Sequence, residues 1–146
     1  YNLHFAAGLF GPPKAVIYRP RIGFNGVDTS GVVLLEYDDF TAVLSGAKDS
    51  SSPGYALIQG ERGYIRANGI PSELKELTVC VDGREETFSK NLDRHRMVDE
   101  MLFFDQILQE NDRESAERLL KHSLVVMEIA EQARKSGGIR FAADEK

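Results

Sequence analysis

Cysteine and long apolar runs are scarce in this sequence, and each shortage excludes a class of protein. Among its 146 residues there is a single cysteine, Cys80, which permits neither an intramolecular disulfide nor a cysteine-based metal cluster. The longest apolar stretches, such as residues 32–35 and 124–127, are far shorter than the roughly 18 residues of a membrane-spanning helix. We therefore expect a cytoplasmic protein with no membrane partner.

Basic patches and the familiar catalytic motifs are also missing. The net charge is −5 and no block of like charges occurs, so we expect no nucleic-acid partner, because such proteins usually carry a basic patch or stripe. The chain contains no dinucleotide fingerprint, phosphate-binding loop, nucleophile elbow or zinc-protease motif. Gly60 and Gly63 stand between predicted strands with no helix behind them, which indicates a hairpin rather than a phosphate site. We expect no cofactor-binding residue in this chain.

The three histidines show no metal-ligand spacing, and we expect no metal site. His122 falls inside a predicted helix near the edge of its apolar stripe, so its expected role is structural. His95 lies between Arg94 and Arg96, where it either binds an anion or faces solvent.

The first ten residues predict a helix that begins without a cap. Its apolar positions recur at helical spacing and Gly11-Pro12-Pro13 ends it. No Ser, Thr, Asp or Asn precedes the helix to satisfy its first amides, and the chain does not begin with Met. We therefore expect that residues 1–146 are a fragment, from which the start of this helix and the part before it have been removed.

Residues 14–92 predict strands. A strand over 14–22 is followed by a loop over 23–31 that is rich in turn-forming residues. Three hairpins follow: 32–37 with 41–47, 55–59 with 64–67, and 77–81 with 85–88 around Asp82-Gly83. In the last of them apolar residues alternate with Thr78 and Cys80, which predicts one buried face and one polar face.

Two helices and a short strand are predicted after the hairpins. Apolar residues at helical spacing indicate a helix over about 94–110, and Asn111 with Glu114 has the spacing of a capping box that opens another helix. Gly137-Gly138 ends this helix, and residues 139–141 favour a short strand. Strands in one run and helices in another indicate an α+β fold, a largely antiparallel open-faced sheet of six to seven strands with helices on one face. The uncovered face must meet water, another domain or a partner subunit, and a homodimer through this face is expected.

Several stretches, taken in order, resemble the C-terminal domain of the Gfo/Idh/MocA family of oxidoreductases. They are Tyr1–Pro13, Gly26-Val27-Asp28-Thr29-Ser30-Gly31-Val32, Gln59-Gly60-Glu61-Arg62-Gly63-Tyr64-Ile65, the helix start at His95-Arg96-Met97 and the ending from Val126 to Asp144. The resemblance implies a dihydrodipicolinate-reductase-like C-terminal domain over 1–146, which supplies substrate contacts and the dimer interface. It also implies an N-terminal Rossmann domain, absent here, that binds NAD or NADP and passes hydride between the cofactor and a sugar, polyol or related hydroxy compound.

The resemblance assigns the candidate site residues. Tyr1 matches the position of a family His or Tyr that exchanges a proton with the reacting oxygen, and the acidic partner would lie four positions before it. His4, one turn later, and Lys48, at a strand end, are candidates for substrate contact. The isolated fragment is expected to bind no cofactor and to be inactive. The alternative is a non-catalytic sugar-binding or assembly module on the same fold.

Overall fold

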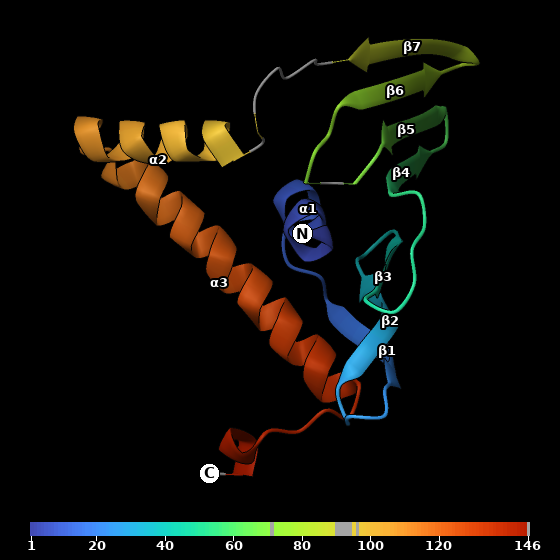
Figure 1. Cartoon of the computed structure of the whole chain (residues 1–146). Coiled ribbons are helices and arrows are strands. Elements are labelled where there is room, and N and C mark those ends of the chain that lie inside the picture. Colours follow the sequence, from blue (N-terminus) through green and yellow to red (C-terminus); the bar gives the residue numbers. More distant parts are fainter. Residues whose placement is uncertain (71, 90–94, 96, 146) are drawn as a thin grey trace. The chain divides into compact units, whose positions relative to one another are not determined.

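The computed structural model describes residues 1–70, 72–89, 95 and 97–145, and it contains two compact units. The first unit comprises residues 1–51 and 117–146, and the second comprises residues 52–116 (Figure 1). The elements in chain order are α1 (Asn2–Phe10), β1 (Ala15–Ile22), β2 (Asp28–Glu36), β3 (Thr41–Ala47), β4 (Tyr55–Gly60), β5 (Gly63–Asn68), β6 (Glu76–Val81), β7 (Arg84–Ser89), α2 (Met97–Glu110), α3 (Arg113–Ser136) and the short 3₁₀ helix η1 (Ala142–Glu145). The predicted α+β class and the antiparallel pairing are confirmed. The strands form two sheets, one of three and one of four.

The first unit is a three-stranded antiparallel sheet, β1-β2-β3, with a core on one face. Side chains alternate between the faces of a strand, so Tyr18, Val33 and Leu44, which pair across the three strands, share one face. Leu35 lies on the same face and is completely buried together with residues of α1 and α3, including Ile129. The opposite face carries Ile17, Leu34 and Val43.

A β-bulge changes the direction of side chains at the start of β2. Arg21 pairs with Ser30, but the next residue of β1, Ile22, pairs with Asp28, so Thr29 is an extra residue in β2. The extra residue places Asp28 on the covered face with Tyr18. It would otherwise lie on the opposite face. The predicted loop over 23–31 is therefore wrong for its last four residues, because ladder pairing with both neighbouring strands overrides their turn-forming composition.

The second unit contains a four-stranded antiparallel sheet in the order β4-β5-β6-β7. Its two predicted hairpins are confirmed. Asp82 and Gly83 both have positive φ, 50° and 77°, as the tight turn of a two-residue hairpin requires. One face is mostly apolar and carries Ala56, Ile58, Ile65, Ala67, Leu77, Val79, Val81 and Phe88, with Arg84 and Glu86 of β7 at its edge.

Thr78 lies on the predicted polar face of this sheet, but it is buried there. Thr78 is only 3% exposed. It is flanked on the neighbouring strands by Arg66 and Thr87, and its hydroxyl lies 3.4 Å from that of Thr87. A hydroxyl that keeps a hydrogen-bond partner can be buried at little loss of stability.

The predicted helices are present, but the cap of α3 differs from the prediction. Asn111 adopts φ 50° and ends α2, so it does not open a capping box with Glu114. Asp112 is the cap instead, since its Oδ1 accepts a hydrogen bond from the Ser115 amide at 3.0 Å. The start of the predicted 94–110 helix falls partly on residues outside those described, and α2 is observed from Met97. None of the helices in the described part of the chain is long and apolar enough to cross a membrane.

The predicted strand over 139–141 is also wrong. The segment after α3 runs into η1, and side chains bind its backbone groups. Arg134 donates to the Ile139 carbonyl at 2.9 Å, and the Phe141 amide donates to Asp144 Oδ2 at 2.8 Å. These local contacts replace the pairing that a strand would need.

Candidate functional site

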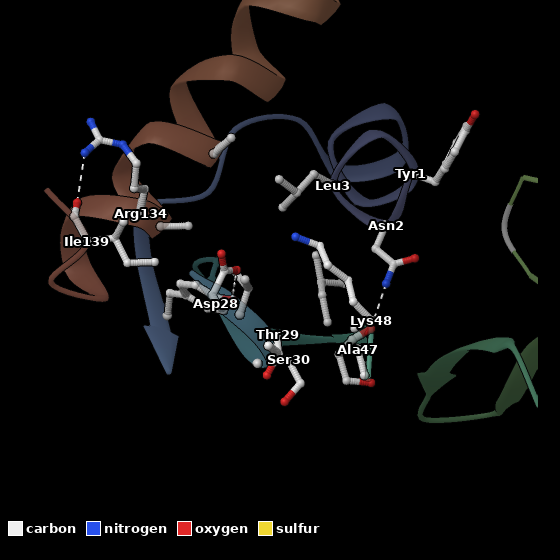
Figure 2. A pocket seen from close by; sticks show the side chains of 18 of the residues that line it. Tyr1, Asn2, Leu3, Asp28, Thr29, Ser30, Ala47, Lys48, Arg134 and Ile139 are labelled. Carbon is white, nitrogen blue, oxygen red and sulfur yellow. Dashed lines mark hydrogen bonds between the residues drawn. The ribbon is translucent and has the colours of Figure 1, made fainter. Parts of the chain in front are cut away.

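The first unit contains a hollow of about 760 Å³. It lies between the first turn of α1, the start of β2 with the end of β3, and the last turn of α3 with the segment that follows (Figure 2). This volume is within the range of small-molecule sites. Apolar side chains form much of its wall, and the polar groups at its edge include Tyr1, Asn2, Asp28, Ser30, Lys48 and Arg134.

Tyr18 and Asp28 form a hydrogen-bonded pair in the wall of the hollow. The Tyr18 hydroxyl donates to Asp28 Oδ2 at 2.7 Å. Burial, followed by the hydrogen bond to Asp28 and its negative charge, raises the pKa of Tyr18 to about 12. The phenol therefore stays protonated and remains a donor across the physiological range.

Two glycines leave room for the Tyr18 ring. A Cβ added at Gly31, on the neighbouring strand, would lie 2.4 Å from Tyr18 Cε2 and 2.7 Å from its hydroxyl oxygen. A Cβ added at Gly137, after α3, would lie 2.8 Å from Tyr18 Cδ1. Because backbone approaches the ring on both sides, the position of the phenol is closely defined.

Lys48 follows β3 directly and lines the hollow. Its amide donates to the Thr29 carbonyl at 2.7 Å, which continues the β2–β3 ladder by one bond. Figure 2 shows its ammonium directed into the hollow. Among the described residues no carboxylate lies within ion-pair distance of it. Lys48 thus presents a positive charge that a ligand can use.

Tyr1 and Asn2 bring α1 to the hollow. Asn2 Nδ2 donates to the Ser45 carbonyl at 2.9 Å and so fixes the start of the helix against β3. Tyr1 is the N-cap residue and lines the hollow, but the residue is 76% exposed overall. Figure 2 shows its hydroxyl pointing away from the hollow.

His4 lies against α3 and is not among the residues that line the hollow. Its Nδ1 is 3.1 Å from Nε2 of His122, and the two ring centroids are 5.2 Å apart. Burial, followed by the charge of His122, lowers the pKa of His4. In the described part of the chain no group of three potential ligands gathers at any point to bind a metal ion.

His95 has a structural contact. Its Nδ1 accepts a hydrogen bond from the Met97 amide at 3.2 Å, at the start of α2. Arg94 and Arg96, which would complete the anion site considered from the sequence, lie outside the described residues.

Arg134 closes one side of the hollow through a bidentate ion pair. Its guanidinium donates to both carboxylate oxygens of Asp144, at 2.6 and 2.8 Å, and also lies 4.5 Å from the centroid of the Phe141 ring. The hydrogen bond from Arg134, followed by that from the Phe141 amide, holds the pKa of Asp144 well below its usual range. Because its charge is paired, Arg134 shapes the wall, whereas Lys48 has no ion-pair partner among the described residues.

The structure therefore brings Tyr1 and Lys48 to one hollow and places His4 elsewhere. Asn2, Tyr18, Asp28 and Arg134 also line the hollow and were not predicted from the sequence. Tyr18 and Asp28 are ten residues apart and meet only through the bulge, so no local spacing indicated them. The basic end of the α3 helix could have indicated Arg134, but not the partner that it binds.

Comparison with known proteins relates the chain to oxidoreductases. No protein-family model matches it. The chain is 37% identical over 145 residues to scyllo-inositol 2-dehydrogenase (NADP⁺) IolU of Bacillus subtilis, covering 99% of this chain and 44% of that protein. It is 28% identical to the oxidoreductase YgjR of Escherichia coli, over 99% of this chain and 43% of that protein. It is 29% identical to the mouse trans-1,2-dihydrobenzene-1,2-diol dehydrogenase, over 100% of this chain and 46% of that protein.

Solved structures share the fold. A candidate oxidoreductase from Klebsiella pneumoniae superposes with a TM-score of 0.63 and 15% identity over 93% of this chain and 45% of that one. The Bacillus subtilis candidate oxidoreductase YvaA gives a TM-score of 0.64 and 19% identity over 93% of this chain and 46% of that one. The chain thus spans less than half the length of the relatives that it matches.

Proposed function

Because the chain is related, over nearly its whole length, to the C-terminal part of oxidoreductases of the Gfo/Idh/MocA type, we propose that it is the substrate-side domain of an NAD(P)-dependent oxidoreductase. The intact enzyme oxidises a hydroxyl-bearing carbon of a sugar, polyol or related compound by hydride transfer to the nicotinamide. The observation that carries the proposal is the hollow in the first unit, with Tyr1 and Lys48 on its wall.

The polar groups of the hollow suit a neutral compound with several hydroxyls. Asp28 accepts hydrogen bonds, Lys48 donates them, and Ser30 can do both. Two of the relatives are named for cyclic substrates that carry hydroxyl groups, scyllo-inositol and a dihydrobenzene diol. These names support the substrate class proposed here.

The described residues do not fit a dinucleotide. Every strand pair is antiparallel, so the described residues contain no parallel βαβ unit whose glycine-rich turn and helix N-terminus would bind a pyrophosphate. The cofactor is accordingly assigned to the remainder of the enzyme.

Tyr1 is the proposed acid/base, and its phenol would need to turn into the hollow. Rotation about its side-chain bonds allows this, because staggered rotamers are separate minima of a flexible side chain, and no hydrogen bond of the Tyr1 hydroxyl is present among the described residues. Removing a positioned acid/base typically lowers the rate by about 10²–10⁴-fold. In the intact enzyme, Tyr1→Phe should lower kcat by this order and leave KM nearly unchanged.

The open face of the first sheet is the proposed homodimer surface. Val43 is 65% exposed and Val32 is 36% exposed, while α1 and α3 contribute to the core on the other face. Val43→Asp should weaken self-association in analytical ultracentrifugation. Phe24→Asp, in the loop between β1 and β2, is the control at an exposed apolar position off this face and should leave the association unchanged.

The function is tested with the full-length protein, NADP⁺ or NAD⁺ and scyllo-inositol, by following formation of the reduced cofactor. Turnover that Tyr1→Phe lowers by about 10²–10⁴-fold supports the enzyme. If the protein binds scyllo-inositol but does not oxidise it with either NADP⁺ or NAD⁺, the result would instead support the alternative, a non-catalytic sugar-binding module.

A further inference from the structure

We propose that Asp28 is the residue of this domain that selects a polyol, accepting hydrogen bonds from two neighbouring substrate hydroxyls, and that Tyr18 is the positioning residue that holds it. The inference rests on the proposed function, because it assigns the recognition of that substrate class to one carboxylate in the hollow.

The β-bulge is the first observation. A bulge disrupts a ladder locally, and bulges are over-represented beside active sites, where they redirect a side chain. Here the extra residue, Thr29, moves Asp28 to the covered face and into the wall of the hollow. Without the bulge, the carboxylate would lie on the face opposite to Tyr18.

The unequal use of the two carboxylate oxygens is the second observation. Oδ2 accepts the Tyr18 hydroxyl at 2.7 Å, whereas among the described residues Oδ1 has no hydrogen-bond donor. An ionised carboxylate has about four acceptor positions on its two oxygens. One contact from Tyr18 therefore orients the group and leaves acceptor positions for two hydroxyls of a ligand.

The close fit around Tyr18 is the third observation. Gly31 and Gly137 bring backbone close to the ring, so the ring has little room to move. The phenol therefore holds the Asp28 carboxylate in one position. The raised pKa of Tyr18 keeps this donor protonated. A carboxylate fixed in this way can accept from two hydroxyls on neighbouring carbons, so it favours such a compound over one with a single hydroxyl.

Lys48 complements this arrangement at the neighbouring strand end. Its amide is bonded to the Thr29 carbonyl, so the ammonium and the carboxylate emerge from adjacent strands into one hollow (Figure 2). A neutral polyol can donate to Asp28 and accept from Lys48. A monohydroxy compound cannot satisfy both of these groups with its one oxygen.

The test compares scyllo-inositol and cyclohexanol as substrates of the full-length enzyme, with Asp28→Asn, Tyr18→Phe and the control Glu36→Gln. Glu36 is an exposed carboxylate at the other end of β2 and does not line the hollow. Losing charge-assisted hydrogen bonds to a substrate typically changes selectivity by about 10-fold or more. We expect Asp28→Asn to raise KM for scyllo-inositol by about 10-fold, with kcat within about threefold and KM for the cofactor unchanged.

Tyr18→Phe should raise the same KM by a smaller factor, and Glu36→Gln should change nothing. The preference for scyllo-inositol over cyclohexanol should fall only in the Asp28 and Tyr18 variants. A KM for scyllo-inositol within twofold of wild type in a folded Asp28→Asn enzyme overturns the inference and leaves the proposed function standing.

If the wild-type enzyme turns over neither alcohol, the proposed function fails, and titration calorimetry with scyllo-inositol then decides the inference separately. Binding that is lost in Asp28→Asn and kept in Glu36→Gln supports the site. Equal binding of scyllo-inositol by Asp28→Asn and Glu36→Gln, or no binding by the wild type, overturns the inference.

Discussion

Replacing Gly31 by alanine should show how much the packing of Tyr18 against this glycine contributes to stability. The same replacement at Gly46 measures the cost of a glycine in a strand without that contact. Gly31 and Gly46 pair with each other across β2 and β3, and neither has positive φ. A Cβ at Gly31 would overlap the Tyr18 ring at 2.4 Å, whereas a Cβ at Gly46 meets nothing within 4 Å. The two positions therefore differ mainly in the presence of the ring.

The magnitude follows from three contributions. An overpacked side chain costs about 1–3 kcal/mol, and displacing Tyr18 from Asp28 removes a hydrogen bond to a charged group that contributes about 1.5–3 kcal/mol. Alanine in place of glycine in a strand regains about 0.5–1 kcal/mol. We expect Gly31→Ala to lower the free energy of unfolding by about 2–5 kcal/mol and Gly46→Ala to raise it by about 0.5–1 kcal/mol.

Amide hydrogen exchange in β2 measures this free energy for the first unit by itself, for instance at Leu35, which is completely buried. Calorimetry should show a parallel drop of roughly 2–4 °C in Tm for each kcal/mol. Equal exchange protection in the two variants would refute the account of Tyr18 packing given above.

Titration examines three other contacts. The Tyr18 phenol should ionise near pH 12 by ultraviolet absorbance, and Asp28→Asn should move this ionisation toward its ordinary value of 10. Since the folded-state pKa is raised, the associated stability is present below pH 10 and is lost between pH 10 and 12. The pKa of His4 is lowered, so the unfolded chain binds its proton more readily than the folded protein does. The free energy of unfolding should therefore fall as pH drops below 6.5. His122→Ala should weaken this pH dependence, as measured by urea titrations at several pH values. Asp144 also has a lowered pKa, so its ion pair stabilises the fold above about pH 3.8 and is lost in acid. Asp144→Asn should therefore be less stable at neutral pH and lose less on acidification, and an unchanged acid transition would contradict this interpretation.

Local signals in the sequence were sufficient for most of the fold. The hairpin at Asp82-Gly83 was predictable because its turn needs residues that adopt positive φ, and these two residues do so readily. The end of α1 at Gly11 was predictable because proline cannot continue a helix. Such signals depend on a few neighbouring residues and need no tertiary structure.

The site was less predictable because its contacts join distant residues. The position of Asp28 depends on a bulge, which is a property of two paired strands and not of either one alone. The course of residues 139–141 depends on Arg134 binding Asp144, ten residues along the chain. Tyr1 was identified through a family resemblance and Lys48 through its position at a strand end, and the hollow that they share appears only when β2 and β3 are paired.

The helix that carries Tyr1 is fixed at both ends, and its far end is held by aromatic residues. The Tyr37 hydroxyl donates to the Gly11 carbonyl at 3.1 Å, and the rings of Phe10 and Phe40 lie 4.9 Å apart. At 1.5 Å per residue, a helix of 9 residues is roughly 13 Å long. The turn between β2 and β3 therefore determines the orientation of a helix whose other end borders the hollow. Variation at Tyr37 or Phe40 would therefore shift the geometry at Tyr1 without changing a residue that lines the hollow.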